Sequence, residues 1–212
     1  MSIWVKICAN TSFEDAMLAV EAGADAVGFV FAASPRQVSV AQVANITARL
    51  PDSIEKIGVF VDASFEEIEK AVRICGLTGV QIHSGGATDL AGRLRERFGA
   101  KLRIVRVLHF GSEEHPRIDA DGAIDTVLVD SRTATAVGGT GTSYDWNAAA
   151  PLFREAGVRL IAAGGLTPAN VQEAIGKLRP WGVDVVSGVE LSFGHKDPEK
   201  VKSFVRNARG DR

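Results

Sequence analysis

The chain has little that would tie it to a membrane, to nucleic acid or to an oxidising compartment. Its 212 residues contain only two cysteines, Cys8 and Cys75, which form no CxxC or zinc-ligand pattern. No apolar stretch approaches the ~18 residues of a membrane span, and no apolar segment with a cleavage signal opens the chain. The net charge of −2 comes without a basic run interleaved with aromatic residues. We therefore expect a cytoplasmic protein that binds neither nucleic acid nor membrane.

Short apolar runs alternate along the chain with segments of helical spacing. The runs are rich in valine and isoleucine and mostly continuous, which is typical of parallel strands buried on both faces. Capping residues such as Ser64 precede the helical segments, and glycines such as Gly76 end them. We predict one compact α/β domain over residues 1–212, a (β/α)8 TIM barrel, although this fold typically needs ~250 residues. The expected strands are 3–8, 25–31, 55–61, 79–83, 102–108, 126–130, 158–163 and 183–186.

Two segments break this alternation. Residues 109–123 are too polar and too marked by glycine and proline for a core helix, so we expect the fifth helix to be short or missing. Residues 131–145 hold glycine, threonine and serine with few apolar anchors. A long loop at the mouth of a barrel is either a lid over the site or an ordinary connector, and composition does not separate the two.

Reactive and glycine-rich residues lie at the downstream ends of the apolar runs. Cys8 ends the first run, Asp130 ends the sixth, and glycines follow the seventh and eighth. The carboxyl ends of the strands of a (β/α)8 barrel meet at one rim, where active sites are found. The spacing therefore predicts one site built from these strand ends.

Glycine clusters after the sixth, seventh and eighth runs indicate a phosphate site. Without a Cβ atom their backbone N–H groups approach anionic oxygens closely, and the loops after the last two strands of this fold often bind phosphate. Any one cluster could be an ordinary turn, but three at adjacent strand ends favour phosphate. A GxxxxGK[ST] sequence is absent, which excludes that kind of nucleoside-triphosphate loop. The candidate phosphate-binding residues are Gly139, Thr140, Gly141, Gly164, Gly165, Ser187 and Gly188.

Cys8 and Asp130 are candidates for acid–base catalysis. A free cysteine is most often a small buried hydrophobe, but Lys6, two residues earlier on the same strand face, would favour its thiolate. Lys6 itself either contacts a substrate or pairs with a carboxylate inside the barrel. A carboxyl group at the end of an apolar strand is partly desolvated, which raises its pKa and suits it to proton donation. Asp130 could instead cap the loop that follows it.

Further side chains near the strand ends could bind a substrate. Arg36, in the loop after the second run, could clamp a carboxylate with two hydrogen bonds or lie in solvent. Gln81 and His83 end the fourth run and are expected to line the pocket. His83 and His109 could form a metal pair, but no carboxylate-rich set accompanies them at ligand spacing, so we expect no metal.

Ten short segments, spread over nearly the whole chain, form a recognisable series. They are VKIC at 5–8, EAGADAVGFVF at 21–31, SPR at 34–36, GVFV at 58–61, VQIH at 80–83, LVDS at 128–131, GGTG at 138–141, DW at 145–146, AGGLTPANV at 163–171 and SGVE at 187–190. In this order they resemble the phosphoribosylanthranilate isomerase family of tryptophan biosynthesis, although the glycine pairs alone also suit related barrel enzymes.

The resemblance implies an isomerase that needs no cofactor or metal. Its reaction would convert N-(5-phosphoribosyl)anthranilate into 1-(2-carboxyphenylamino)-1-deoxyribulose 5-phosphate, an Amadori rearrangement. The resemblance further implies that Cys8 is the general base, that Asp130 is the general acid and that Arg36 contacts the anthranilate end of the substrate. The glycine loops would hold the phosphate. We expect a monomer whose partner is this small phosphosugar.

The chain departs from the family at a few positions. Ala9 follows the reactive cysteine, and Ser84 follows the histidine of the fourth strand, where the family usually has glycine. Ala9 could crowd the backbone beside Cys8 and lower the efficiency of the reaction. Two alternatives stay open: a metal-dependent sugar-phosphate epimerase that uses His83 and His109, and a phosphosugar-binding barrel without catalysis.

Overall fold

Eight parallel strands close into a barrel in the computed structural model, which describes residues 2–83, 87–110, 122–131 and 144–210. Each strand pairs with the next, and β8 pairs with β1 to close the ring. The predicted (β/α)8 TIM barrel is therefore confirmed. The strands are β1 Trp4–Ile7, β2 Ala26–Val30, β3 Glu55–Val61, β4 Gly79–His83, β5 Arg103–Phe110, β6 Thr126–Ser131, β7 Arg159–Ala162 and β8 Gly182–Val185.

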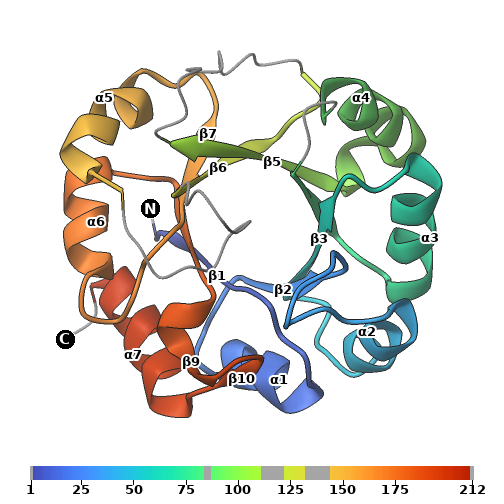
Figure 1. The fold of residues 1–212 in the computed structure, drawn as a ribbon, viewed down its shortest axis with the longest axis horizontal. Helices are drawn as coiled ribbons and strands as arrows, with labels where there is room; N and C mark the ends of the chain where they lie inside the picture. The colour runs from blue at the N-terminus through green and yellow to red at the C-terminus, as the bar shows by residue number, and fades with distance from the viewer. Residues whose placement is uncertain (1, 84–86, 111–121, 132–143, 211–212) are drawn as a thin grey trace.

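Helices form a ring around the outside of the strands (Figure 1). A two-stranded hairpin, β9 Glu190–Ser192 and β10 His195–Lys196, follows β8. None of the helices in the described part of the chain is both long and apolar enough to cross a membrane. The α-helices are α1 Phe13–Glu21, α2 Val40–Thr47, α3 Phe65–Cys75, α4 Ala87–Phe98, α5 Trp146–Glu155, α6 Val171–Leu178 and α7 Pro198–Arg209, and the 3₁₀ turns are η1 Gly99–Lys101 and η2 Ser187–Val189.

Two of the predicted features fall largely outside the described residues. The short or missing fifth helix was expected within 109–123, of which 111–121 are not described. The candidate lid was expected at 131–145, of which 132–143 are not described. Both stay predictions.

The helices begin and end where the sequence supplies caps. Ser64 accepts a hydrogen bond from the amide of Glu67, and the Glu67 carboxylate accepts one from the amide of Ser64, which is the capping box that this spacing predicts. Gly76 ends α3 in the left-handed conformation. At α7, Asp197 caps the helix directly before Pro198. Because all neighbouring strands of the barrel are parallel, their carboxyl ends meet at one rim.

Alternate residues of each strand point into the barrel, and the others pack against the helices. The interior holds an apolar cluster separate from the larger core beneath the helices. Farther toward the carboxyl ends of the strands the buried inward side chains become polar, beginning with Lys6 and Gln81. The interior cluster consists of Trp4, Ala26, Ile57, Val105, Leu128, Ile161 and Ala163.

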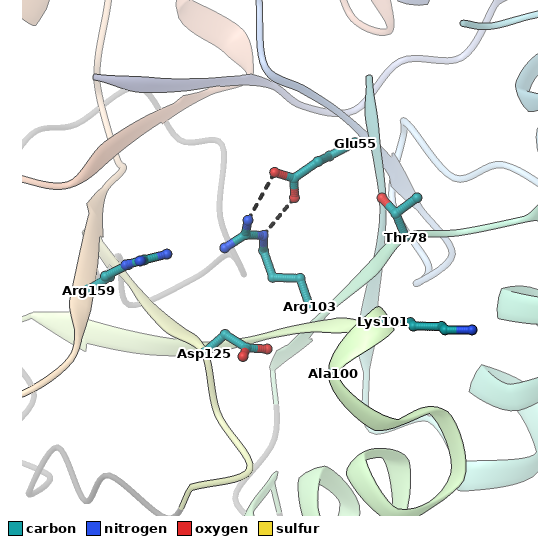
Figure 2. Close-up of a pocket in the computed structure, with 7 residues that line it drawn as sticks. All are labelled: Glu55, Thr78, Ala100, Lys101, Arg103, Asp125 and Arg159. Atoms are coloured by element: carbon teal, nitrogen blue, oxygen red, sulfur yellow. Dashed lines mark hydrogen bonds and ion pairs between the residues drawn. The ribbon is translucent and has the colours of Figure 1, made fainter. Parts of the chain in front are cut away.

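The amino-end rim carries a polar pocket of about 510 Å³. Figure 2 shows its centre, where Arg103 donates two hydrogen bonds to Glu55, 2.6 and 3.0 Å long. The Arg103 guanidinium also lies 5.8 Å from the ring of Trp4 and 5.1 Å from that of Trp181, and the two indoles stack on each other. Because catalysis in this fold takes place at the opposite rim, we interpret these residues as a plug that closes the bottom of the barrel.

Candidate active site

A pocket of about 470 Å³ opens at the carboxyl-end rim of the barrel. Cys8 follows β1 and Asp130 belongs to β6, and both side chains line this pocket. In the ring of strands β1 and β6 are separated by β7 and β8, so the two residues approach the pocket from nearly opposite sides. Three other predicted residues, Arg36, Gln81 and His83, line the same pocket.

A niche of about 30 Å³ adjoins the pocket at the ends of β7 and β8. Asp130 and Asp184 line both spaces. Gly164 and Gly165 have φ angles of 80° and 65°, which glycine adopts without strain. The predicted phosphate-binding residues in the niche are Gly164, Gly165, Ser187 and Gly188. The others, Gly139, Thr140 and Gly141, lie outside the described residues.

Gly188 stands where the loops after β7 and β8 touch. A Cβ atom at this position would overlap the carbonyl oxygen of Leu166, which is a backbone atom and cannot simply rotate away. We expect Gly188→Ala to lower the free energy of unfolding by ~1–3 kcal/mol, the usual effect of extra carbon in a packed site, as measured by urea titration.

The matched control is Gly176→Ala, because Gly176 lies inside α6 with nothing close to its Cβ position. Alanine is favoured over glycine inside a helix by roughly 0.5–1 kcal/mol, so this variant should be slightly stabilised. Equal effects of the two substitutions would contradict the packing argument for Gly188.

Cys8 is buried after β1, and Gly28 of β2 makes room for its thiol. A Cβ atom on Gly28 would lie 2.5 Å from the Cys8 Sγ and 2.9 Å from the Lys6 Cε. Burial raises the pKa of the thiol above its ordinary value, and the charges of Lys6 and Lys196 counteract part of that rise. The side chain therefore rests as a neutral thiol, and its ionisation depends on these two cations.

Lys6 lies beneath the pocket rather than in its wall, and it is 1% exposed. Its ammonium group donates to Oε1 of Gln81 at 2.7 Å and pairs with Asp184 at 3.0 Å. Burial lowers the pKa of Lys6, but the negative charge of Asp184 and the nearby Cys8 outweigh it and raise the net pKa. The geometry supports a cation paired inside the barrel and not the direct substrate contact that was expected of Lys6.

Asp184 is a candidate site residue that the sequence analysis did not single out. It lies inside β8 and lines both the pocket and the niche. After burial, its negative charge is the next cause that raises the pKa of Asp130. The available signal was a charged residue within the apolar run 183–186, the same signal that drew attention to Lys6.

Asp130 is 7% exposed at the end of β6. Burial raises the pKa of its carboxyl group to about 6, and the charge of Asp184 adds to this effect. The Oδ1 atom accepts a hydrogen bond of 2.7 Å from the backbone N–H of Ser131, which orients the side chain. A carboxyl group with this pKa can hold a proton and release it close to neutral pH, as a general acid must.

Ala9 follows Cys8 in the left-handed conformation, with a φ of 61°. A residue other than glycine pays roughly 1–2 kcal/mol there, which explains why glycine suits the position. Two backbone hydrogen bonds of 2.9 Å hold the turn. The amide of Cys8 donates to Val185, and the amide of Asn10 donates to Gly28. The crowding expected beside Cys8 thus takes the form of backbone strain.

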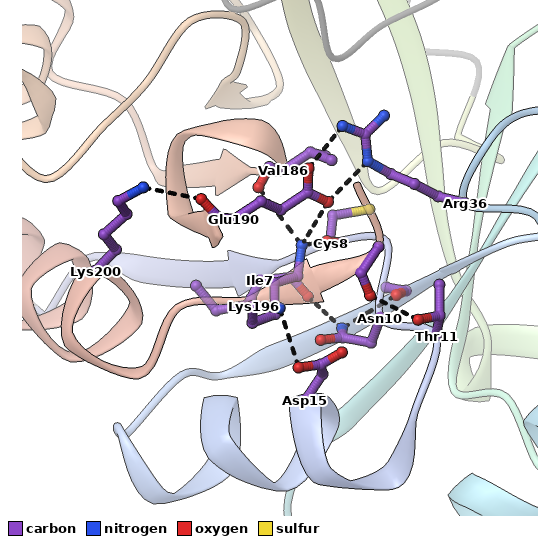
Figure 3. A network of polar contacts seen from close by, with 12 residues as sticks. Ile7, Cys8, Asn10, Thr11, Asp15, Arg36, Val186, Glu190, Lys196 and Lys200 are labelled. Carbon is purple, nitrogen blue, oxygen red and sulfur yellow. Dashed lines mark hydrogen bonds and ion pairs between the residues drawn. The ribbon is translucent and has the colours of Figure 1, made fainter. Parts of the chain in front are cut away.

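Arg36 forms a two-pronged clamp, but the carboxylate that it holds belongs to the protein. Its Nε and Nη2 atoms donate to the buried Glu190 at 2.7 and 2.6 Å (Figure 3). The ring of Phe193, which is 71% exposed, lies 4.9 Å from the guanidinium. The Nη1 atom takes no part in the clamp, so Arg36 keeps hydrogen-bond donors for a second anion at the pocket wall.

His83 is kept neutral chiefly by burial, and it lies at the end of a chain of hydrogen bonds that begins at Lys6. Because an ammonium group only donates, Gln81 turns its oxygen to Lys6 and its NH₂ group to Nε2 of His83, at 2.9 Å. Burial, followed by the charges of His109 and Lys6, lowers the pKa of His83 to about 4. The His83 and His109 ring centroids are 6.1 Å apart. Within the described ranges, no group of three or more His, Cys, Asp and Glu side chains could hold a metal ion.

A known protein family matches nearly the whole chain. The model of the N-(5'-phosphoribosyl)anthranilate isomerase family matches residues 5–207. The chain belongs to this family. The match includes Cys8, Arg36 and Asp130 as well as the glycine loops, so the resemblance seen in the sequence is confirmed.

Relatives in the family cover nearly the whole chain. An N-(5'-phosphoribosyl)anthranilate isomerase of Pelobacter propionicus is 41% identical over 211 residues, which are 99% of this chain and 97% of the relative. A phosphoribosyl anthranilate isomerase solved with reduced 1-(o-carboxyphenylamino)-1-deoxyribulose 5-phosphate has a TM-score of 0.82 and 33% identity, with 98% and 99% of the two chains covered. The structure of monomers generated from the dimeric phosphoribosylanthranilate isomerase of Thermotoga maritima has a TM-score of 0.81 and 34% sequence identity to this chain. The comparison covers 98% of this chain and 99% of that one.

Proposed function

We propose that the chain catalyses the Amadori rearrangement of N-(5-phosphoribosyl)anthranilate to 1-(2-carboxyphenylamino)-1-deoxyribulose 5-phosphate, with Cys8 as the general base and Asp130 as the general acid. The observation that carries the proposal is a single pocket, lined by both side chains, that continues into a niche walled by glycines. A phosphate, a ribose and an aromatic carboxylate are the three parts of the substrate, and each finds complementary groups along this cavity.

The niche suits the phosphate group. The loops after β7 and β8 bring Gly164, Gly165 and the 3₁₀ turn η2 to its wall, and glycine has no side chain that would cover its backbone N–H group. The carboxylates of Asp130 and Asp184 would repel a phosphate dianion. The phosphate therefore lies against the amides, and the two carboxyl groups face the ribose next to it.

The first chemical step opens the ribose ring. A proton passes from the Asp130 carboxyl group to the ring oxygen, and the bond between C1 and that oxygen breaks. The electron pair of the anthranilate nitrogen forms a C=N double bond at C1, which leaves an iminium ion. Burial supports this role, because it raises the pKa of Asp130 to about 6 and so retains the proton to a higher pH.

The second step removes the proton from C2. The iminium ion makes this C–H bond acidic, and the Cys8 thiolate takes the proton and leaves an enolamine. The enolamine then tautomerises to the ketone. C2 is oxidised while C1 is reduced in the same molecule, so the reaction needs no external oxidant or reductant.

The aromatic carboxylate fits the part of the pocket around Arg36. The guanidinium donors that Glu190 leaves free can bind a carboxylate at the pocket wall. Phe193 and Pro35 contribute apolar surface on the same side, against which an aromatic ring can pack. Substrate carboxylate and ring are thus recognised together.

Turnover separates this function from its alternatives. Phosphoribosylanthranilate is supplied to the enzyme, and the loss of anthranilate fluorescence is followed with time. We expect saturable turnover that survives exhaustive treatment with EDTA. Activity that disappears with EDTA and returns with metal would favour the metal-dependent epimerase. Micromolar binding without turnover would favour a phosphosugar-binding barrel.

Arg36→Lys is expected to raise KM for phosphoribosylanthranilate at least ~10-fold, with a smaller effect on kcat. Lysine keeps the charge but lacks the planar fork that serves Glu190 and a second carboxylate together, and one hydrogen bond to a charged group contributes ~1.5–3 kcal/mol. Steady-state kinetics measures the effect. Urea unfolding is measured in parallel, because weakening a buried ion pair also destabilises the fold.

The matched control for this prediction is Arg49→Lys. Arg49 is exposed and its guanidinium lies over the ring of Phe13, away from the pocket. Its kinetic constants should stay at wild-type values. A folded Arg36→Lys enzyme with an unchanged KM would place Arg36 outside the substrate site.

We further propose that residues 1–212 form one catalytic domain that acts as a monomer in the cytoplasm. The Thermotoga maritima relative is described as dimeric, so a dimer is the competing state. Sedimentation velocity over a range of protein concentrations distinguishes the two.

A further inference from the structure

We infer that Lys196, on the hairpin after β8, positions the general base and places a second positive charge beside it. The inference rests on the proposed function, since it concerns the thiol of Cys8. Lys196 belongs to β10, outside the barrel, yet its side chain turns inward and is 0% exposed. Nothing in the sequence analysis pointed to this residue.

The Lys196 ammonium group bridges the seam where the barrel closes. It donates to the carbonyl oxygen of Cys8 at 2.6 Å and lies 3.5 Å from that of Val186 (Figure 3). A backbone hydrogen bond, from the amide of Cys8 to the carbonyl oxygen of Val185, already joins these strand ends one residue before Val186. Lys196 therefore ties Cys8 to the end of β8 at the point where the lining of the pocket begins.

The hairpin that carries Lys196 is itself anchored to the start of the chain. The backbone N–H of Lys196 donates to Oδ1 of Asp15 at 3.0 Å, and the Thr11 hydroxyl donates to the carbonyl oxygen of Gly194 at 2.6 Å. Both partners lie just after Cys8 in the sequence. The ammonium group is thus held at a defined place relative to the thiol.

The charge on Lys196 is only partly balanced. Its one carboxylate partner in the described part of the chain is Glu190, at 3.4 Å, and Glu190 is already clamped by Arg36. Two cations share Glu190, and the Asp15 carboxylate contacts the backbone N–H of Lys196 and not its ammonium group, so the ammonium group has no carboxylate of its own among the described residues. The other cation near the thiol, Lys6, is paired with Asp184.

An unmatched cation held away from water stabilises a neighbouring anion. The charged groups that act on the Cys8 thiol are Lys6, Asp184 and Lys196, of which the two lysines favour the thiolate and the aspartate opposes it. Lys6 favours the thiolate most strongly and Asp184 opposes part of that effect, so the charge of Lys196 adds a second contribution in favour of the thiolate.

The test measures ionisation of the thiol without using the isomerase reaction. The rate of alkylation of Cys8 by iodoacetamide is followed against pH, by mass spectrometry of the Cys8 peptide. We expect Lys196→Met to raise the thiol pKa by about one unit, as loss of a nearby opposite charge does. kcat should fall about tenfold, in proportion to the thiolate fraction, while KM changes little.

Three further variants complete the experiment. Lys202→Met is the matched control, because Lys202 is exposed on α7 and pairs only with Glu199 among the described residues, so it should change neither value. Lys196→Gln keeps a donor for the Cys8 carbonyl but loses the charge, and it should raise the thiol pKa as Lys196→Met does. Lys196→Arg keeps the charge and should leave the thiol pKa near that of the wild type.

Each result decides the inference. An unshifted thiol pKa in a folded neutral variant overturns it, and so does a raised thiol pKa in folded Lys196→Arg. If Lys196→Met does not fold, Lys196→Gln and Lys196→Arg carry the comparison. Because alkylation needs no substrate, an inactive wild-type protein would overturn the proposed function while the thiol pKa values still tested the role of Lys196.

Discussion

Asp130→Asn is expected to lower kcat by ~10²–10⁴, the usual contribution of one general acid. The amide has nearly the shape of the carboxyl group, and its oxygen can still accept the hydrogen bond from the backbone N–H of Ser131. What the variant loses is the proton that opens the ribose ring. At saturating phosphoribosylanthranilate the loss should appear in kcat, with KM changed much less.

The same substitution should make the protein more stable at pH 7. Burial raises the pKa of Asp130 from 3.8 to about 6, so the folded protein binds this proton more tightly than the unfolded chain does. The stabilisation from the bound proton is complete below the unfolded pKa and is lost as the pH rises through the folded one. An asparagine stays neutral throughout, so at pH 7 the variant should unfold with up to about 3 kcal/mol more free energy, at ~1.4 kcal/mol per pKa unit. Urea titrations at pH 7 and below pH 4 measure this gain and its disappearance.

The pH dependence of kcat/KM follows from the pKa values of the proposed acid and base, because the proposed acid has the lower pKa of the two. Burial raises the pKa of Asp130 to about 6 and raises the pKa of the Cys8 thiol above its ordinary value, yet the proposed mechanism needs the proton on Asp130 and none on Cys8. Between the two pKa values the pair holds a single proton, and the active arrangement is the minor one of the two forms that carry it. kcat/KM should therefore rise up to about pH 6, level off, and decline as Cys8 ionises. In Asp130→Asn the break near pH 6 should vanish, so that kcat/KM keeps rising with the thiolate fraction until Cys8 is ionised.

The control for these measurements is Asp52→Asn, whose side chain is fully exposed in the loop before β3. It should leave kcat, stability and the pH profile unchanged. A near-normal kcat in Asp130→Asn would contradict its role as the acid. A persisting break near pH 6 in that variant would show that another group titrates there.

The barrel could be predicted because its signals are local and recur along the chain. A run of β-branched residues, followed by a helical segment with a capping residue at its start and a glycine at its end, marks one β/α unit. As an example, β7 at Arg159–Ala162 falls inside the expected range of 158–163. The largest difference is at β5, which extends to Phe110 instead of ending at 108. His109 and Phe110 continue the strand because β5 pairs with β6 as far as Ser131. This pairing is a tertiary contact, which the composition of the segment does not reveal.

Sequence reasoning reached pocket-lining residues at strand ends, in glycine pairs and at Arg36 in the loop after β2. Whether Lys6 meets substrate or a carboxylate depends on the register of β1 against β8, which sets it opposite Asp184. Glu190 and Lys196 reach Arg36 and Cys8 across most of the chain, and no spacing rule indicates which buried charge meets which. Long-range charge pairing is thus the part of the site that requires the folded structure.

Cys8→Ser is expected to lower kcat by at least ~10², and by as much as ~10⁴. The buried thiol already ionises with difficulty, and its thiolate forms only because two lysines and the developing iminium ion favour a negative charge nearby. A hydroxyl group is a far weaker acid, so the same cations cannot produce a useful fraction of alkoxide. Cys8→Ala should show an equal loss, and the loss of anthranilate fluorescence measures both.

The second cysteine of the chain provides the matched control. Cys75 is also buried, but it lies on α3 with its Sγ atom 3.4 Å from the carbonyl oxygen of Val40, away from the pocket. Cys75→Ala should cost about 1 kcal/mol of stability for the lost side-chain burial and leave kcat intact. If Cys8→Ser retained near-normal kcat, the base would have to be another group. If Cys75→Ala lost as much activity as Cys8→Ser, the effect would come from packing around buried sulfur and not from proton abstraction, because Cys8 lines the pocket and Cys75 does not.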